Sequence, residues 1–147
     1  MKEVEILIVE DSAEDVELMM RALKRHNLAN RVHVCEDGQD ALDYLFRTGT
    51  YENRPGNETP KVVFLDLKLP KVDGLEVLRK LKSTEETKLI PIVIVTSSQE
   101  EPDLAECYKL GANSYVVKPV AFESFLKVIS DLGFYWLLVN KQPLRGV

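Results

Sequence analysis

Four short runs of apolar residues, each rich in valine and isoleucine, constrain the fold of this chain more than any other feature. Within each run the apolar residues are nearly continuous, which is typical of strands that are covered on both faces. A fifth segment, 31–35, alternates instead and is predicted to be an edge strand with Val32 and Val34 on its buried side. The four runs are 4–9 (VEILIV), 62–67 (VVFLDL), 90–96 (IPIVIVT) and 114–118 (SYVVK).

Segments with helical spacing separate the predicted strands. In the first of them, apolar residues recur at positions i, i+3, i+4 and i+7 from Val16 to Leu23, and Ser12 is placed to cap the free amides of the opening turn. Gly111 follows the fourth such segment and marks its end. The predicted helices cover 13–26, 38–46, 74–83, 101–110 and 121–138.

The alternation of strands with helices predicts an α/β fold with a doubly wound, five-stranded parallel sheet. Right-handed crossovers leave few topologies. We expect the flavodoxin-like strand order 2-1-3-4-5, because it places the alternating second strand at an edge and the most apolar runs inside. At 147 residues the chain fits a single domain, 1–147, with an extended C-terminal helix.

The composition argues against several classes of protein, namely nucleic-acid-binding, membrane-spanning and secreted ones. The net charge is −5 and the basic residues are interspersed with acids, which argues against nucleic-acid binding. No apolar stretch has the length of a membrane span, and the opening residues MKEVEILIVEDS lack the features of a signal peptide. We therefore expect a cytoplasmic protein without membrane contact. Cys35 and Cys107 stand far apart and are expected to be buried small residues rather than a disulfide or a zinc site.

Polar residues gather where the predicted strands end. Glu10 and Asp11 follow the first strand, Asp66 ends the third, Thr96 ends the fourth and Lys118 ends the fifth. In an open parallel sheet, ligands bind beyond the carboxyl ends of the strands, near the point where strand order reverses. These side chains are therefore expected to converge on one crevice.

Three neighbouring carboxylates repel each other, and a divalent cation resolves the conflict. Mg²⁺ prefers oxygen ligands and is usually held by one or two carboxylates together with a phosphoryl group. We assign it to Asp11 and Asp66, with Glu10 just outside the ligand set and the backbone carbonyl of Lys68 as a further ligand.

A carboxylate beside a metal ion and a lysine can attack phosphorus, because cations share the charge of the transition state. Asp66 is the candidate nucleophile, and Lys118 is the candidate ammonium. Thr96 is expected to donate its hydroxyl to the bound phosphoryl group after moving toward it, and that movement would be the output signal.

Over about residues 4–132 the chain resembles the receiver domain of bacterial two-component response regulators. The resemblance implies phosphoryl transfer from a phosphohistidine on a sensor histidine kinase to Asp66, dependence on Mg²⁺, and later hydrolysis of the acyl phosphate. It also implies that Thr96 and Tyr115 form a switch pair and that the Lys118–Pro119 bond is cis. The residues that carry the resemblance are Glu10-Asp11, Asp66 followed by Pro70 and Gly74, Thr96, Tyr115, and Lys118-Pro119.

Two other functions on related folds are less well supported. A phosphatase of the haloacid-dehalogenase type needs a second acid two residues after its nucleophile, and here that position is Lys68. A flavin carrier needs a phosphate-binding loop rich in Ser, Thr and Gly after the first strand, whereas EDSAED is acidic. Each candidate residue taken alone could have an ordinary structural role. The functional interpretation therefore depends on all of these residues occurring together.

Two segments depart from an ordinary receiver domain. The segment 47–60 is longer than most connections in such folds, and its composition disfavours a helix, so we expect either a mobile surface loop or a partner contact. Such an insertion and an extended last helix resemble stand-alone receivers that serve phytochrome-like sensor kinases.

The C-terminal extension, 133–147, begins with FYWLLV at 134–139, which is apolar all round. Something must cover it, either a second copy in a homodimer, which we favour, or the chain's own domain. Only NKQPLRGV follows, so signalling is expected to require a downstream protein target.

Overall fold

A five-stranded parallel sheet forms the centre of the computed structural model, which describes residues 4–56 and 59–143. The strands lie in the order β2-β1-β3-β4-β5, and each pairs in parallel with its neighbour. The predicted fold class and strand order are therefore confirmed. The strands are β1 (Ile6–Val9), β2 (Val32–Cys35), β3 (Val62–Leu65), β4 (Ile92–Thr96) and β5 (Ser114–Val117).

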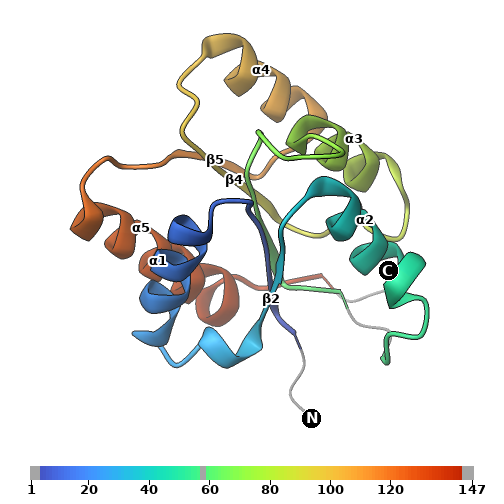
Figure 1. Cartoon of the computed structure of the whole chain (residues 1–147), viewed down its shortest axis with the longest axis horizontal. Helices are drawn as coiled ribbons and strands as arrows, with labels where there is room; N and C mark the ends of the chain where they lie inside the picture. The colour runs from blue at the N-terminus through green and yellow to red at the C-terminus, as the bar shows by residue number, and fades with distance from the viewer. Residues whose placement is uncertain (1–3, 57–58, 144–147) are drawn as a thin grey trace.

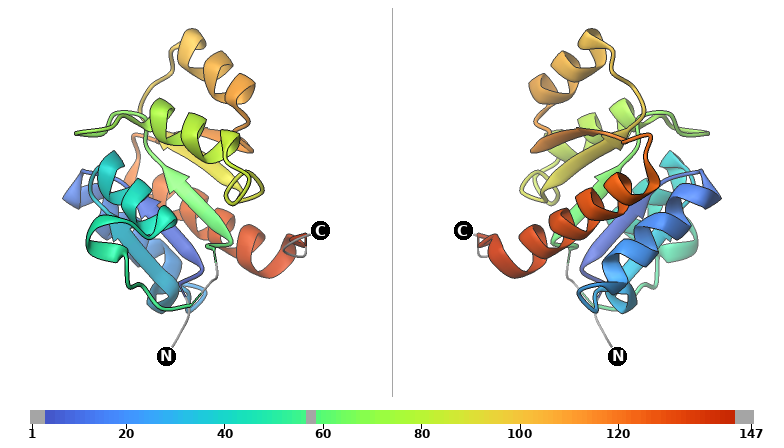
Figure 2. Two further views of the ribbon diagram at one scale, coloured as in Figure 1. Left: turned by 90° about the vertical axis from the view of Figure 1, so that its right-hand side faces the viewer. Right: turned by 90° about the vertical axis from the view of Figure 1, so that its left-hand side faces the viewer.

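Helices cover both faces of the sheet, with α2, α3 and α4 on one face and α1 and α5 on the other (Figures 1 and 2). The helices are α1 (Ala13–Lys24), α2 (Gly38–Phe46), α3 (Gly74–Ser83), α4 (Glu101–Leu110) and α5 (Phe122–Phe134). Short helical turns lie at η1 (Ala29–Arg31), η2 (Gly49–Tyr51) and η3 (Tyr135–Val139). In the part of the chain that the structure describes, no helix is both long and apolar enough to cross a bilayer.

Local sequence signals fix where the helices begin and end. The side chains of Ser12, Asp37 and Asp73 accept hydrogen bonds from the first turns of α1, α2 and α3, as residues at these positions commonly do. Gly111 ends α4 in the left-handed conformation with a φ of 107°, which a glycine adopts without steric cost. The predicted cap at Ser12 and helix end at Gly111 are confirmed.

Two apolar clusters, one on each face of the sheet, form the core. Because successive side chains of a strand point to opposite faces, Leu7 and Val9 join the cluster under α2, α3 and α4, while Ile6 and Ile8 join the cluster under α1 and α5. The pairing places Val9 level with Leu65 of β3, so the loops after β1 and β3 leave the sheet side by side.

Part of the segment 47–60 packs against the rest of the domain. The turn η2 forms within it, and the Tyr51 ring lies edge-on to the rings of His33 and Tyr44. The guanidinium of Arg54 lies 4.1 Å from the centre of the Tyr44 ring. We call these four residues, His33, Tyr44, Tyr51 and Arg54, the aromatic cluster. Part of the expected loop therefore packs against the domain, and residues 57–58 lie outside the described residues.

The last helical segment spans 122–139, close to the predicted 121–138, but it changes type along its length. Regular α-helix ends at Phe134 and continues as the wider π-helical turn η3. Within this turn Leu137 is buried and Trp136 packs against the core cluster under α1 and α5. Four other side chains of the segment remain exposed, namely Phe134, Tyr135, Leu138 and Val139. The C-terminal segment therefore packs in part against its own domain. Residues 144–147 lie outside the described residues.

Candidate functional site

Three carboxylates meet beyond the carboxyl ends of β1 and β3. Oxygen atoms of Glu10, Asp11 and Asp66, one from each residue, all lie within 4.8 Å of one another. Glu10 and Asp66 are buried, whereas Asp11 is exposed to solvent. The convergence of these acids agrees with the strand-end argument, and it produces a set of hard oxygen donors that is open on one side.

Lys118 reaches into this acidic group from the end of β5. Its ammonium nitrogen lies 2.7 Å from Glu10 Oε1 and 3.0 Å from Asp66 Oδ2. It also lies 2.7 Å from Oδ2 of Asp15, in the first turn of α1. One cation thus contacts three carboxylates while its own side chain is only 12% exposed.

Burial and charge both alter the protonation of this group. Burial raises the pKa of Glu10 to about 7, and the neighbouring charge of Asp66 acts in the same direction, although the hydrogen bond from Lys118 opposes both. Burial alone would lower the pKa of Lys118, but its hydrogen bonds to Asp15 and Glu10 raise that pKa above its ordinary value. Lys118 is therefore charged at neutral pH, and the crevice carries more negative than positive charge.

The backbone after β3 fixes the position of the Asp66 side chain. Oδ1 of Asp66 accepts hydrogen bonds from the amides of Leu67 at 2.7 Å and Lys68 at 3.5 Å. At Gly74 a side chain would be impossible without movement, because its Cβ would lie 2.2 Å from the Asp66 carbonyl oxygen. Gly74 thus lets α3 begin directly against the residue whose carboxylate faces the crevice.

Thr96 and Tyr115, the expected switch pair, both contact Ser98 in the loop after β4. Thr96 is fully buried, and its hydroxyl oxygen accepts a hydrogen bond from the Ser98 amide at 3.4 Å. The Tyr115 hydroxyl donates to the Ser98 carbonyl at 3.0 Å. The Ser98 hydroxyl in turn donates to Asp103 Oδ2, on α4, at 2.6 Å. The sequence did not predict that Ser98 would bond to Thr96, Tyr115 and Asp103.

The cis geometry expected for the Lys118–Pro119 bond is wrong, since the described part of the chain contains no cis peptide bond. The trans form is lower in free energy even before proline. Lys118 still reaches Glu10 and Asp66 from a trans peptide, so its contacts do not depend on the cis form.

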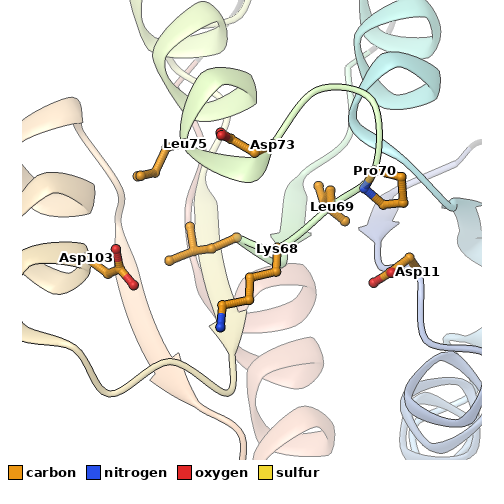
Figure 3. A pocket seen from close by; sticks show the side chains of 8 residues that line it. Asp11, Lys68, Leu69, Pro70, Asp73, Leu75 and Asp103 are labelled. Carbon is orange, nitrogen blue, oxygen red and sulfur yellow. The ribbon is translucent and has the colours of Figure 1, made fainter.

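A cavity of about 340 Å³ lies beside the acids, between the loop after β3 and α4 (Figure 3). Figure 3 shows the Lys68 side chain projecting into this space, with Asp103 on one side and Asp11 on the other. Small solutes therefore have room to approach Asp11 from solvent. The lining residues are Asp11, Leu67, Lys68, Leu69, Pro70, Asp73, Leu75 and Asp103.

Asp15 is a member of the site that the sequence analysis did not select. Its backbone amide donates to the Ser12 hydroxyl at 3.3 Å as part of the cap of α1. Helical spacing does not connect it to Asp11 in the sequence, because Asp11 precedes the cap residue Ser12 and lies outside α1.

The family comparison agrees with this geometry. Residues 6–130 match the family described as the response regulator receiver domain. The chain belongs to this family. The resemblance inferred from the sequence is thereby confirmed, and receiver domains act in signalling as acceptors of a phosphoryl group.

Relatives of known name share most of the length of the chain. The probable methanogenesis regulatory protein FilR2 of Methanothrix harundinacea is 40% identical over 138 residues, which are 94% of this chain and 86% of that protein. The response regulator Rcp1 of Synechocystis is 36% identical over 132 residues, 90% of this chain and 88% of Rcp1.

Solved structures resemble the fold closely. The crystal structure of Mn²⁺-bound Rcp1 superposes with a TM-score of 0.88 at 35% identity, covering 98% of this chain and 100% of that one. The bacteriophytochrome response regulator AtBRR is 54% identical with a TM-score of 0.72, covering 96% and 99%. Nothing in these comparisons supports the haloacid-dehalogenase-type phosphatase.

Proposed function

We propose that Asp66 is the phosphoacceptor of this response regulator and that Lys118 and the acids of the crevice support the transfer. The observation that carries the proposal is the position of the buried Asp66 carboxylate, 3.0 Å from the Lys118 ammonium and grouped with two further carboxylates at the open end of the sheet. A carboxylate that could act as nucleophile, a fixed cation and a candidate metal site share one crevice, and this combination supports the proposal.

The donor set fits Mg²⁺. All three clustered groups are carboxylates, which suit a hard cation, and the exposed side of Asp11 leaves room for bound water and a phosphoryl oxygen. Asp11 and Asp66 would hold the ion, with Glu10 beside them and the Lys68 carbonyl as a further ligand. When bound, Mg²⁺ supplies positive charge that reduces repulsion among the carboxylates and the incoming phosphoryl group.

The transfer itself needs little from the protein beyond position and charge. A carboxylate oxygen of Asp66 attacks the phosphorus of a phosphohistidine; the O–P bond forms as the N–P bond breaks, and the electron pair leaves with the imidazole nitrogen. The Lys118 ammonium lies where it can donate to a phosphoryl oxygen as negative charge develops there.

The resulting acyl phosphate is expected to hydrolyse slowly. Two residues after the nucleophile the chain carries Lys68 where a phosphatase would carry an acid, so no carboxylate at that position activates the attacking water. Water attack on phosphorus returns the Asp66 carboxylate and releases inorganic phosphate. The same groups would allow transfer from small phosphodonors that enter through the cavity in Figure 3.

The signal would pass through Thr96 and Tyr115. The Thr96 hydroxyl oxygen accepts a hydrogen bond from the Ser98 amide, and a phosphoryl group on Asp66 would offer a charged acceptor to the Thr96 O–H. Movement of Thr96 toward that acceptor would disturb the loop that Tyr115 contacts through the Ser98 carbonyl. Phosphorylation would thus shift a population between two arrangements of this loop.

We infer that the phosphodonor is a phytochrome-like sensor histidine kinase and that the output is contact with a downstream protein. The likeness to a bacteriophytochrome response regulator at 54% identity supports this choice of kinase. The named role of FilR2 in methanogenesis points to a different pathway for that relative, so a transfer assay with candidate kinases should decide the partner.

The assignment of Asp66 is tested by labelling with radioactive acetyl phosphate and Mg²⁺. The unaltered protein should take up one phosphoryl group that hydroxylamine removes, and Asp66→Asn should take up none. Asp131→Asn, which alters an exposed acid on α5, should label normally. Retained labelling in Asp66→Asn would place the phosphoacceptor elsewhere. Labelling that survives a chelator would contradict the metal dependence.

We further propose a homodimer formed through α4, β5, α5 and the C-terminal segment. The exposed apolar side chains Tyr135, Leu138 and Val139 in η3, together with Phe122 on α5, support it. Trp136 is an unsuitable test position because it packs on the core. Leu138→Glu should instead give monomers in sedimentation velocity while the unaltered chain gives dimers, and an unchanged mass would contradict the interface.

A further inference from the structure

The Asp15 carboxylate has no part in the transfer as proposed, yet it makes one of the shortest contacts in the crevice. Its Oδ2 lies 2.7 Å from Lys118 Nζ, as close as Glu10 Oε1 and closer than Asp66 Oδ2 at 3.0 Å. The two residues are 103 positions apart in the chain. The contact therefore joins the first turn of α1 to the residue after β5, and it does not come from local helix geometry.

This contact leaves the Lys118 ammonium fully occupied. An ammonium group has three N–H donors, and here Glu10, Asp15 and Asp66 each accept one. A phosphoryl group on Asp66 brings new, strongly charged acceptor oxygens to the same place. Lys118 can donate to one of them only if it gives up a hydrogen bond that it makes in the resting protein.

The bond to Asp15 is the one that is released at the lowest cost. Glu10 is 2% exposed, so its carboxylate would be left buried without its cation if Lys118 turned away. The Asp15 side chain is 26% exposed, and water can replace the ammonium as its partner. Once Asp66 is phosphorylated, its phosphoryl oxygens accept hydrogen bonds from Lys118 and so hold the ammonium near Asp66.

We propose that Asp15 is a positioning residue that restrains Lys118 in the resting protein and gives it up when Asp66 is phosphorylated. The inference rests on the proposed role of Asp66. Because the bond to Asp15 is the one that Lys118 gives up to serve the phosphoryl group, its loss adds to the cost of the transfer, and Asp15 therefore slows phosphorylation. It does so without contacting the phosphodonor or joining the cluster of Glu10, Asp11 and Asp66.

A simpler role for Asp15 must be separated from this one. Acids in the first turn of a helix are stabilised by the helix dipole, and any acid near the crevice repels an anionic phosphodonor. Glu14 offers a matched control, because it lies in the same turn of α1, carries the same charge and is exposed. Neither general effect distinguishes Asp15 from Glu14, whereas the contact with Lys118 does.

The test compares initial rates of labelling by radioactive acetyl phosphate, with Mg²⁺ at saturation, for the unaltered chain, Asp15→Asn, Glu14→Gln and Asp15→Glu. Asp15→Asn should label several-fold faster, up to about tenfold, because a charge-assisted hydrogen bond no longer holds the ammonium. Glu14→Gln should label at the unaltered rate. Asp15→Glu, which restores the carboxylate, should return the rate to within about twofold of the unaltered chain. Thermal melts by circular dichroism confirm that each variant is folded.

The possible failures are distinct. Equal acceleration in Asp15→Asn and Glu14→Gln would show general charge repulsion and overturn the restraint, as would an unchanged or slower rate in Asp15→Asn. In both cases the unaltered chain still becomes labelled at Asp66, so the proposed function survives. If neither the unaltered chain nor any variant takes up label, the role of Asp66 fails and the inference fails with it.

Discussion

The acidic crevice and the aromatic cluster both contain several ionisable side chains, but the crevice holds them by charge pairing and the cluster by ring packing. In the crevice one ammonium serves three carboxylates, and burial raises the pKa of Glu10 to about 7. In the aromatic cluster, His33 stacks on Tyr44 with ring centres 4.2 Å apart, and the Tyr51 hydroxyl lies 3.2 Å from His33 Nε2. The first region keeps uncompensated negative charge that a cation can neutralise, whereas the second stabilises the fold.

The largest expected effect comes from removing the cation of the crevice. Lys118→Met leaves Glu10, Asp15 and Asp66 without their ammonium, and breaking such a buried ion pair costs about 3–5 kcal/mol of unfolding free energy. Urea denaturation at about pH 8 with a chelator present measures it. The control Lys127→Met breaks an exposed pair with Asp131 and should cost less than about 0.5 kcal/mol. Similar losses in both variants would contradict the contrast.

A smaller loss is expected from the aromatic cluster. Tyr51→Ala removes the ring that packs on His33 and Tyr44, and the loss of such contacts should lower the unfolding free energy by about 1–3 kcal/mol. Tyr51→Phe keeps the ring but removes the hydroxyl and its contacts with His33 and Asp40, which should cost about 0.5–1.5 kcal/mol. Labelling by acetyl phosphate should be unchanged in both variants. A defect in labelling without a loss of stability would mean that the cluster serves the site directly.

The raised pKa of Glu10 predicts how the metal-free protein responds to acid. Its folded pKa of about 7 exceeds its ordinary value of 4.5, so between these values the folded protein binds a proton that the unfolded chain does not. The unfolding free energy should therefore rise by about 1 kcal/mol as the pH falls from about 8 to about 6. The physical reason is that protonation of Glu10 removes one negative charge from a crevice with too few cations. Glu10→Gln should remove this rise, and a rise that persists would assign it to another group.

His33 should give the smallest effect, with the opposite sign. Burial lowers its pKa below the ordinary 6.5, with Arg54 acting in the same direction and Asp40 against it. The unfolded chain therefore binds more protons, and stability is lost as the pH falls through about 6.5. In a Glu10→Gln background, chemical denaturation between about pH 8 and about pH 5.5 should show this loss, and adding His33→Gln should flatten it. An unchanged slope would mean that His33 does not couple protonation to folding.

Much of the fold could be predicted because its causes are local or repeat along the chain. The apolar runs fixed the strands, Ser12 and Gly111 fixed two helix ends, and the strand-end rule brought Glu10, Asp11 and Asp66 together. These inferences needed only periodicity and the rule that parallel strands end at one edge.

What could not be predicted depends on side chains that meet across the fold. The contact of Asp15 with Lys118 joins α1 to the end of β5, and the packing of Tyr51 on His33 joins η2 to an edge strand. Neither pair has a spacing that periodicity reveals. The composition of 47–60 suggested a loop because glycine and proline disfavour regular helix, but Tyr51 and Arg54 hold part of it against Tyr44. The turn η3 likewise follows from where Trp136 and Leu137 pack, which apolar composition alone does not specify.

Ser98 carries bonds to three separate elements of the molecule. Its amide bonds to Thr96 at the end of β4, its carbonyl to Tyr115 on β5, and its hydroxyl to Asp103 on α4. No one of these elements can shift far while the other two keep their bonds to this residue. Any response that passes through the loop is therefore shared among them, and it should appear at the surface of α4 as one concerted step and not as a graded series of adjustments.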